Sequence, residues 1–147
     1  MKTALISNPI KDAGFACAAK VAEYLLAKNT EVFSDKDGIC PGVKTLPLAE
    51  CVKNADVVIT VGGDGTILHT ASVSAKAGVP LVGINLGKVG YMAEIEPDEL
   101  ALLDRLFDKN YTSEKRMLLD AKVIRDGKTE CVDKFAIDKD GSGTVTD

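Results

Sequence analysis

Residues 57–66, VVITVGGDGT, decide the fold of this chain of 147 residues. The stretch 57–61 is apolar on both faces, which is typical of a central strand in a parallel sheet. The strand ends abruptly at Gly62-Gly63-Asp64-Gly65, and residues 66–76 continue with the pattern of a helix. This order of strand, tight turn and helix predicts an α/β domain whose glycine-rich turn follows a buried strand.

The same alternation extends to both sides of this stretch. Strands are predicted over 4–7, 31–33 and 81–84, an extended segment over 91–95, and helices over 15–28, 48–53 and 97–107. Strands that alternate with helices indicate an open parallel sheet with helices on both faces. We assign residues 1–112 to this α/β domain.

The pattern changes after residue 112. Residues 117–125 and 128–137 read as two strands, and Asp126-Gly127 between them is a strong hairpin signal. Residues 113–147 are therefore expected to begin an all-β domain with its first antiparallel strands. Because two strands do not make a sheet of useful size, we interpret this second domain as truncated.

Composition and charge exclude several classes of protein. The chain has 18 Lys and Arg against 22 Asp and Glu, a net charge of −4, which lacks the electrostatic footprint of a nucleic-acid binder. No apolar run approaches the roughly 20 residues that span a bilayer, so we expect no membrane partner. Four cysteines without a paired motif, and one histidine, give zinc little support. Without an export signal, we expect free thiols and a cytoplasmic location.

The first glycine-rich turn is the leading candidate for a functional site. Glycines let the backbone approach a bulky ligand and adopt positive φ, and backbone N–H groups at a helix start can bind phosphate. Asp64 repels phosphate, so its place there makes sense if it takes a proton from a hydroxyl or binds a bridging metal ion. The alternative is a tight strand-to-helix turn in which Asp64 only caps the helix.

A second glycine-rich loop follows the strand over 81–84. Residues 83–91, GINLGKVGY, again allow close backbone approach, and Asn85 and Tyr91 add polar and aromatic groups. The loop is not a P-loop, because no Gly-Lys-Ser/Thr ending is present, and no GxGxxG follows the first strand. Because each of the two loops follows a predicted parallel strand, both lie at the carboxyl ends of strands, where open α/β sheets bind their ligands.

These motifs together resemble those of one kinase family. Gly62-Gly63-Asp64-Gly65-Thr66 is shared by phosphofructokinases, lipid kinases and NAD kinases, whereas residues 85–94, NLGKVGYMAE, are similar to the NxGxLGF(L)xE segment of NAD kinases. Asn8-Pro9 after the first strand and residues 115–119, KRMLL, also resemble that family. The resemblance extends to about residue 137.

The resemblance implies an activity and a set of site residues. NAD kinases transfer a phosphoryl group from ATP, or in some cases polyphosphate, to the adenosine-ribose 2′-hydroxyl of NAD, giving NADP. It implies that Asp64 is the general base and that Mg²⁺ neutralises phosphate charge. It further implies that nucleotide binding involves Gly63, Gly65, His69, Asn85, Tyr91 and Asp138. On the residues alone, a solvated side chain is the favoured interpretation of His69, and Tyr91 could equally be a core aromatic.

The end of the chain departs from the family pattern. NAD kinases carry Ala-Leu-Asn followed by an acid at the start of their β domain, whereas this chain has Asp138 and Lys139 at the last two of those positions. Residues 138–147 also match the first ten positions of an EF-hand loop, without its position-12 glutamate. We therefore expect little activity from residues 1–147 alone.

The sequence thus predicts a phosphotransferase similar to NAD kinase, with NAD and ATP as its small-molecule partners. The resemblance also implies a homo-oligomer for the full-length protein. Two alternatives stay open: another kinase with a GGDG motif that acts on a lipid or sugar, and a non-catalytic nucleotide-binding module with a partial EF-hand-like tail.

Overall fold

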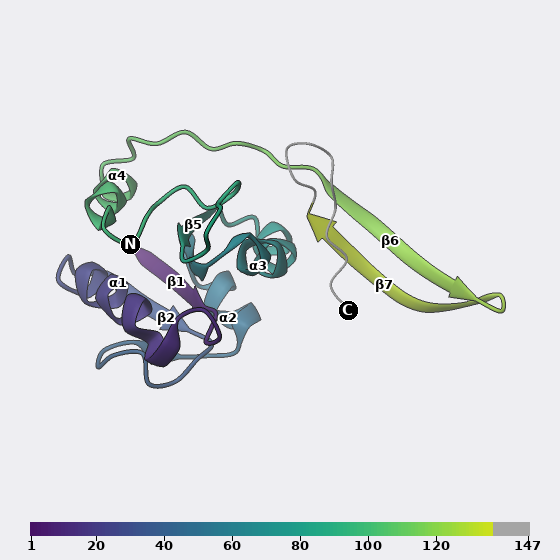
Figure 1. Cartoon of the computed structure of the whole chain (residues 1–147), viewed down its shortest axis with the longest axis horizontal. Coiled ribbons are helices and arrows are strands. Elements are labelled where there is room, and N and C mark those ends of the chain that lie inside the picture. Colours follow the sequence, from purple (N-terminus) through teal and green to yellow (C-terminus); the bar gives the residue numbers. More distant parts are fainter. Residues whose placement is uncertain (137–147) are drawn as a thin grey trace. The chain divides into compact units, whose positions relative to one another are not determined.

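The computed structural model describes residues 1–136, without the side chains of 119–121 and 130–136, and divides into two units, Met1–Thr112 and Ser113–Asp147. The first unit is built on a five-stranded parallel sheet with the order β3-β2-β1-β4-β5 (Figure 1). Its strands are β1 (Lys2–Ser7), β2 (Glu31–Ser34), β3 (Lys44–Thr45), β4 (Val57–Gly62) and β5 (Leu81–Asn85). The predicted open parallel sheet is therefore confirmed.

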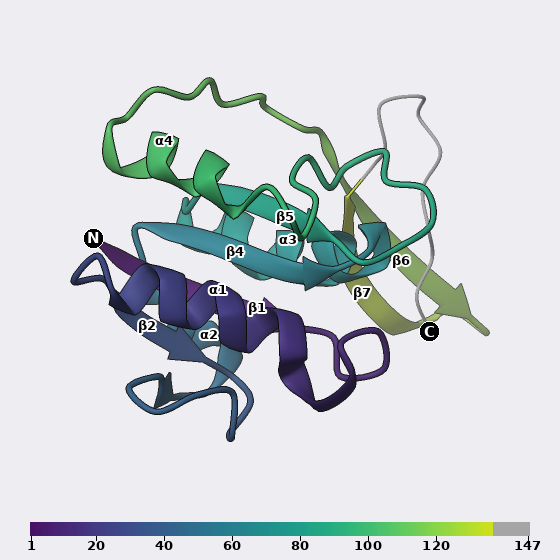
Figure 2. The same cartoon turned by 60° about the vertical axis from the view of Figure 1, so that its left-hand side comes forward.

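Helices cover both faces of this sheet, as predicted (Figure 2). The helical elements are the 3₁₀ turn η1 (Ala13–Phe15), α1 (Ala16–Leu26), α2 (Leu48–Lys53), α3 (Asp64–Ala77), the 3₁₀ turn η2 (Leu100–Leu103) and α4 (Asp104–Phe107). α1, η2 and α4 pack against one face, and α2 and α3 against the other. The central strands are consequently buried on both sides.

The core follows from the alternation of side chains along the central strands. Leu5 and Ile59 face the α1 side, whereas Ala4 and Val58 face the α2 side. Every residue of β4 is buried, which explains its unbroken apolar sequence. The glycine-rich turn after β4 is thus attached to the most deeply buried strand of the sheet.

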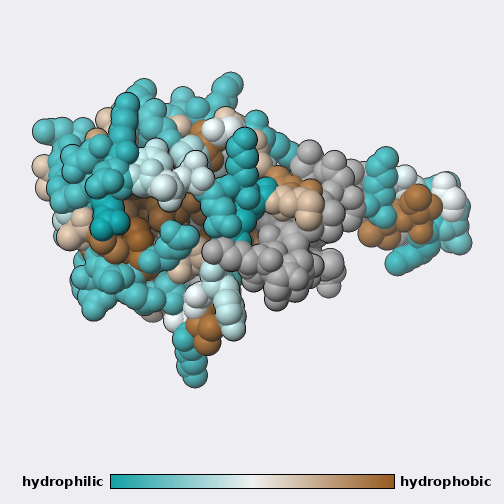
Figure 3. Space-filling view, turned by 90° about the horizontal axis from the view of Figure 1, so that it is seen from above, coloured by the Kyte–Doolittle hydropathy of each residue, from teal (hydrophilic) through white to brown (hydrophobic). Residues whose placement is uncertain are grey.

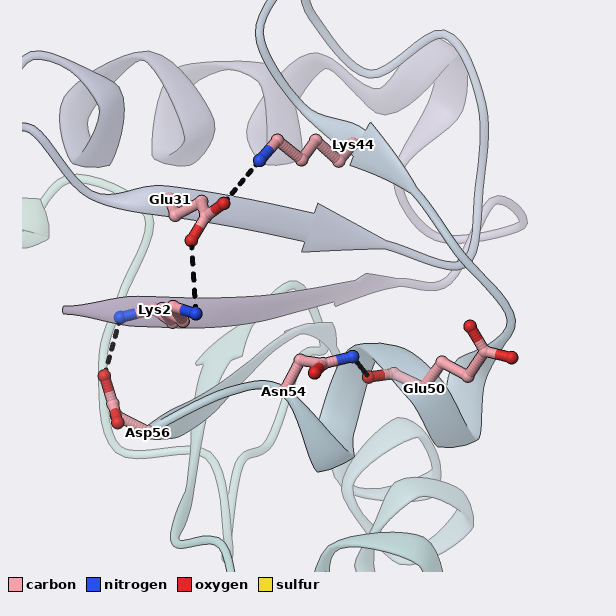
Figure 4. A network of polar contacts seen from close by, with 6 residues as sticks. All are labelled: Lys2, Glu31, Lys44, Glu50, Asn54 and Asp56. Carbon is pink, nitrogen blue, oxygen red and sulfur yellow. Dashed lines mark hydrogen bonds and ion pairs between the residues drawn. The ribbon is translucent and has the colours of Figure 1, made fainter.

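Charged side chains join the strands at their amino ends, opposite the glycine-rich turns. Glu31, at the start of β2, pairs with Lys44 on one side and with Lys2 on the other, the latter at 3.6 Å (Figure 4). The backbone N–H of Lys2 also donates to Asp56, just before β4, at 2.7 Å. These contacts are exposed and add little stability. They lie at the amino ends of the strands, and the glycine-rich loops follow the carboxyl ends.

Two predicted elements differ in the structure, and one strand was not predicted. The segment predicted as extended over 91–95 pairs only through the isolated bridge Ile84↔Ile95, because the N–H groups of residues 91–93 bind Asp64 instead of a neighbouring strand. The helix expected over 97–107 is the shorter pair η2 and α4, since a turn closed by the bond from Glu99 N–H to the Glu96 carbonyl precedes it. β3 escaped the sequence analysis because two exposed residues carry no alternating pattern.

The second unit contains an antiparallel hairpin, as predicted. Its strands are β6 (Leu118–Arg125) and β7 (Lys128–Ala136), joined at Asp126 and Gly127, which both adopt positive φ. Val123 is 49% exposed and Ile124 65%, and Figure 3 shows hydrophobic side chains on the surface of this hairpin. No helix within residues 1–136 is both long and apolar enough to cross a bilayer.

Candidate functional site

The site lies where the strand order of the sheet reverses. From β1 the chain runs outward through β2 to β3 and then returns to place β4 on the other side of β1. Ser7 pairs with Val61, and Gly62 pairs with Asn85, so the loops after β1, β4 and β5 begin at the same edge. Ligands of open α/β sheets bind in the crevice at such a switch point.

Asp64 reaches from the first glycine-rich turn to the second loop. It is the first residue of α3 and is only partly buried. Its Oδ2 accepts a hydrogen bond from the Tyr91 N–H at 3.1 Å, and its Oδ1 accepts from Met92 and Ala93 at 3.1 and 3.3 Å. The helix-capping alternative is wrong, because Gly63 is the N-cap and no side-chain cap bond is present.

Gly62 and Gly83 are needed for space and not for an unusual backbone conformation. We expected positive φ in the first turn, but no glycine of residues 62–65 or 83–90 adopts it. A Cβ added at Gly62 would lie 2.3 Å from Thr66 Oγ1, and one at Gly83 would lie 2.5 Å from Ile67 Cδ1. The backbone of these strands therefore packs directly against side chains of α3.

Gly65 differs from the other glycines of the site. It is exposed, and no described atom lies within 4 Å of the position that its Cβ would occupy. It stands in the first turn of a helix, where alanine would stabilise the helix by about 1 kcal/mol relative to glycine. Packing and backbone conformation thus give no reason for glycine at this position.

The second loop is shaped by Asn85, which is only 6% exposed. Its Oδ1 accepts the Gly87 N–H at 2.9 Å, and its Nδ2 donates to Glu96 Oε1 at 3.1 Å. The polar groups of Asn85 are thus engaged within the loop. Tyr91, by contrast, is 72% exposed, so the expectation of a core aromatic is wrong.

The remaining predicted site residues are Gly63, His69 and Asp138. Gly63 is buried beside the crevice, and His69 is exposed on α3 one turn after Gly65. Asp138 and the EF-hand-like stretch lie outside the described residues. Among the side chains that the structure describes, no three His, Cys, Asp or Glu residues come together as a metal-binding group.

Sequence analysis missed Lys11, which follows β1 at the same edge of the sheet. Its Nζ lies 3.0 Å from the position that a Cβ on Gly63 would occupy and 3.6 Å from that of Gly87. The signal available was a lysine two residues after Asn8-Pro9, in a third loop at the carboxyl end of a parallel strand. The site is therefore built from three loops, whereas the sequence indicated two.

Comparison with known proteins adds independent evidence. Residues 43–111 match the family model described as ATP-NAD kinase N-terminal domain. The chain is 40% identical over 131 residues to the NAD kinase of Natranaerobius thermophilus, covering 84% of this chain and 45% of that protein. The chain thus spans less than half the length of this curated relative.

Two solved structures share the fold. Yeast NADH kinase complexed with NADH superposes with a TM-score of 0.71 at 18% identity, covering 93% of this chain and 46% of that chain. An NAD kinase from Archaeoglobus fulgidus in complex with ATP gives a TM-score of 0.60 at 22% identity, with 82% and 43% covered. These two structures show the class of fold, an open α/β domain built on a parallel sheet. Within that class, the chain belongs to the ATP-NAD kinase family and matches its N-terminal domain.

Proposed function

We propose that this chain supplies the catalytic α/β part of an enzyme that phosphorylates the adenosine-ribose 2′-hydroxyl of NAD with ATP, giving NADP. The observation that carries the proposal is the position of Asp64 at the edge of the sheet where the strand order reverses. Its carboxylate is partly exposed, and no salt bridge among the described residues engages it. A side chain buried in the core or paired with a cation could not meet a substrate hydroxyl.

Asp64 can accept a proton without leaving its loop contacts. A carboxylate offers about four lone-pair sites, and in the described residues Oδ1 accepts two N–H groups while Oδ2 accepts one. The remaining site on Oδ2 is the one proposed to accept the ribose hydroxyl proton as the oxygen attacks the transferred phosphoryl group. The backbone N–H groups of residues 91–93 hold the carboxylate in place during that transfer.

The glycine-rich turn is proposed to hold the nucleotide. Gly65 leaves open space in the first turn of α3, where backbone N–H groups favour phosphate, and Gly63 lies next to it. His69, one turn further on, would contact the nucleotide, and so would Tyr91, which is exposed and whose backbone N–H donates to Asp64. Asn85 contributes by fixing the second loop, and Asp138 is proposed to bind the adenosine side of NAD.

We propose that Mg²⁺ arrives with the nucleotide. This ion is usually held by one or two carboxylates together with substrate phosphates, and here the phosphates would hold most of it, because the one open site on Asp64 is assigned to the ribose hydroxyl. When bound, Mg²⁺ neutralises phosphate charge.

We also propose a cytoplasmic location and a homo-oligomeric full-length enzyme. In this proposal residues 113–147 begin the β domain, and residues 1–147 show little activity alone.

The test compares this chain alone with the same chain joined to the C-terminal part of the Natranaerobius thermophilus relative. Each protein is incubated with ATP, Mg²⁺ and NAD, and NADP is measured with an NADP-specific dehydrogenase. We expect turnover from the joined protein only, and a loss of about 10²–10⁴-fold in Asp64→Asn. Asp108→Asn, an exposed carboxylate at the end of α4, is the matched control. Phosphorylation of a lipid or sugar in place of NAD would overturn the proposal.

A further inference from the structure

The turn after β1 holds Lys11 in a defined place. The carbonyl of Asn8 accepts the N–H groups of Lys11 and Asp12 at 3.1 and 2.8 Å, and Asn8 Oδ1 accepts the Ile10 N–H at 3.0 Å. The Asn8 N–H in turn donates to the Val61 carbonyl of β4 at 3.0 Å. These bonds fix the turn against the strand that carries the first glycine-rich loop.

The ammonium group of Lys11 lies over the backbone of both glycine-rich loops. It stands close to Gly63 and Gly87, where any larger residue would contact it. None of the salt bridges among the described residues involves Lys11, and its side chain is exposed. Lys2 and Lys44, at the amino ends of their strands, differ from Lys11 because both form ion pairs with Glu31.

A cation at this place resolves a difficulty of the site. The crevice must hold a phosphate chain next to the negative charge of Asp64, which repels it. The ammonium of a lysine is a compact charge with three donors, and it suits phosphate oxygens of varied geometry. Lys11 brings that charge from a third strand end to the edge of the sheet where Asp64 lies.

We propose that Lys11 binds the polyphosphate chain of the nucleotide and offsets the charge of Asp64. This inference rests on the proposed function for the identity of the ligand. Lys11 forms no covalent bond and moves no proton; it contributes hydrogen bonds and charge to the bound phosphates. Glycine at position 63 then has a purpose, which is to leave room for the Lys11 ammonium group beside the first glycine-rich turn.

The experiment measures binding of ATP, tripolyphosphate and adenosine to this chain by calorimetry. Lys11→Met is expected to weaken ATP and tripolyphosphate about tenfold or more, as for a lost charged hydrogen bond, and to leave adenosine unchanged. Lys11→Arg should keep most of the affinity. Lys76→Met, an exposed lysine at the far end of α3, is the matched control and should bind as the unchanged chain does.

The outcomes separate this inference from the proposed function. Equal affinity of Lys11→Met and the unchanged chain for tripolyphosphate would overturn the role of Lys11, and so would an absence of tripolyphosphate binding in the unchanged chain. Circular dichroism of each variant shows whether a loss of affinity reflects unfolding, and a folded Lys11→Met with weaker binding supports the role. If binding depends on Lys11 but the joined protein forms no NADP, the proposed function fails while the anion site stands.

Discussion

The β1–α1 and β4–α3 connections each contain an aspartate that accepts three hydrogen bonds, yet the two carboxylates serve different ends. Asp12 accepts Ser7 Oγ–H and the N–H groups of Cys17 and Ala18, at 2.8–2.9 Å, all within its own connection. Asp64 accepts three N–H groups from a loop 27–29 residues further along the chain. The hydrogen bonds of Asp12 hold the start of α1, and those of Asp64 join the two glycine-rich loops.

Burial separates these two carboxylates more clearly than the number of their bonds. Asp12 is 3% exposed, whereas Asp64 is partly open at the crevice. A carboxylate as buried as that of Asp12 cannot meet a substrate, whatever its sequence context. A glycine-rich turn leaves Asp64 accessible, and this accessibility distinguishes a candidate base from a structural aspartate.

The largest expected effect is a difference in stability between two single variants, Asp12→Asn and Asp64→Asn. Asp12→Asn turns one acceptor oxygen into a donor that faces buried donors, which should cost about 2–3 kcal/mol. Asp64→Asn should cost about 1 kcal/mol or less, because water can satisfy groups at the exposed crevice. Urea unfolding of the two variants measures both values. Equal losses would mean that Asp64 is as structural as Asp12.

The glycines of the β4–α3 connection sharpen the comparison at a smaller scale. Gly62→Ala places a Cβ against Thr66 and should destabilise the fold by about 1–2 kcal/mol. Gly65→Ala meets no described atom and should stabilise α3 by up to about 1 kcal/mol, while weakening ATP binding. Thermal unfolding with and without ATP separates the two effects. Undiminished ATP binding in Gly65→Ala would remove Gly65 from the nucleotide site.

The smallest expected effect concerns the thiol of Cys17, whose N–H donates to Asp12. Burial first, and then the charge of Asp12, raise the pKa of this thiol above its ordinary value. Removing the charge in Asp12→Asn should lower that pKa and speed alkylation at pH 8, by less than about tenfold because burial is the larger cause. Asp64→Asn should leave the alkylation rate of Cys17 unchanged.

Cys51 supplies the control for unfolding in this experiment. It is fully buried, and burial raises the pKa of its thiol to about 11. A parallel rise in Cys51 alkylation would show that Asp12→Asn reacts through unfolded molecules. An unchanged Cys17 rate, with Cys51 still protected, would show that Asp12 has no effect on the pKa of the Cys17 thiol.

The sequence predicted the sheet and the position of Asp64 because both depend on local patterns. Buried parallel strands need continuous apolar runs, and the glycine-rich turn follows the strongest of them. The contacts of Asp64 could not be predicted, since its partners are backbone N–H groups that every non-proline residue carries. Asp12 gave no signal for a similar reason, because its role depends on burial and not on residue type.

The segment that contacts Asp64 also folds back along β5, which has β4 as its only partner strand in the described sheet. The Asn85 N–H donates to the Ile95 carbonyl at 2.8 Å, and the Ile95 N–H donates to the Gly83 carbonyl at 3.2 Å. An uncovered strand edge invites pairing with another chain. By holding residues 91–93, Asp64 therefore also helps to keep the outer edge of β5 covered.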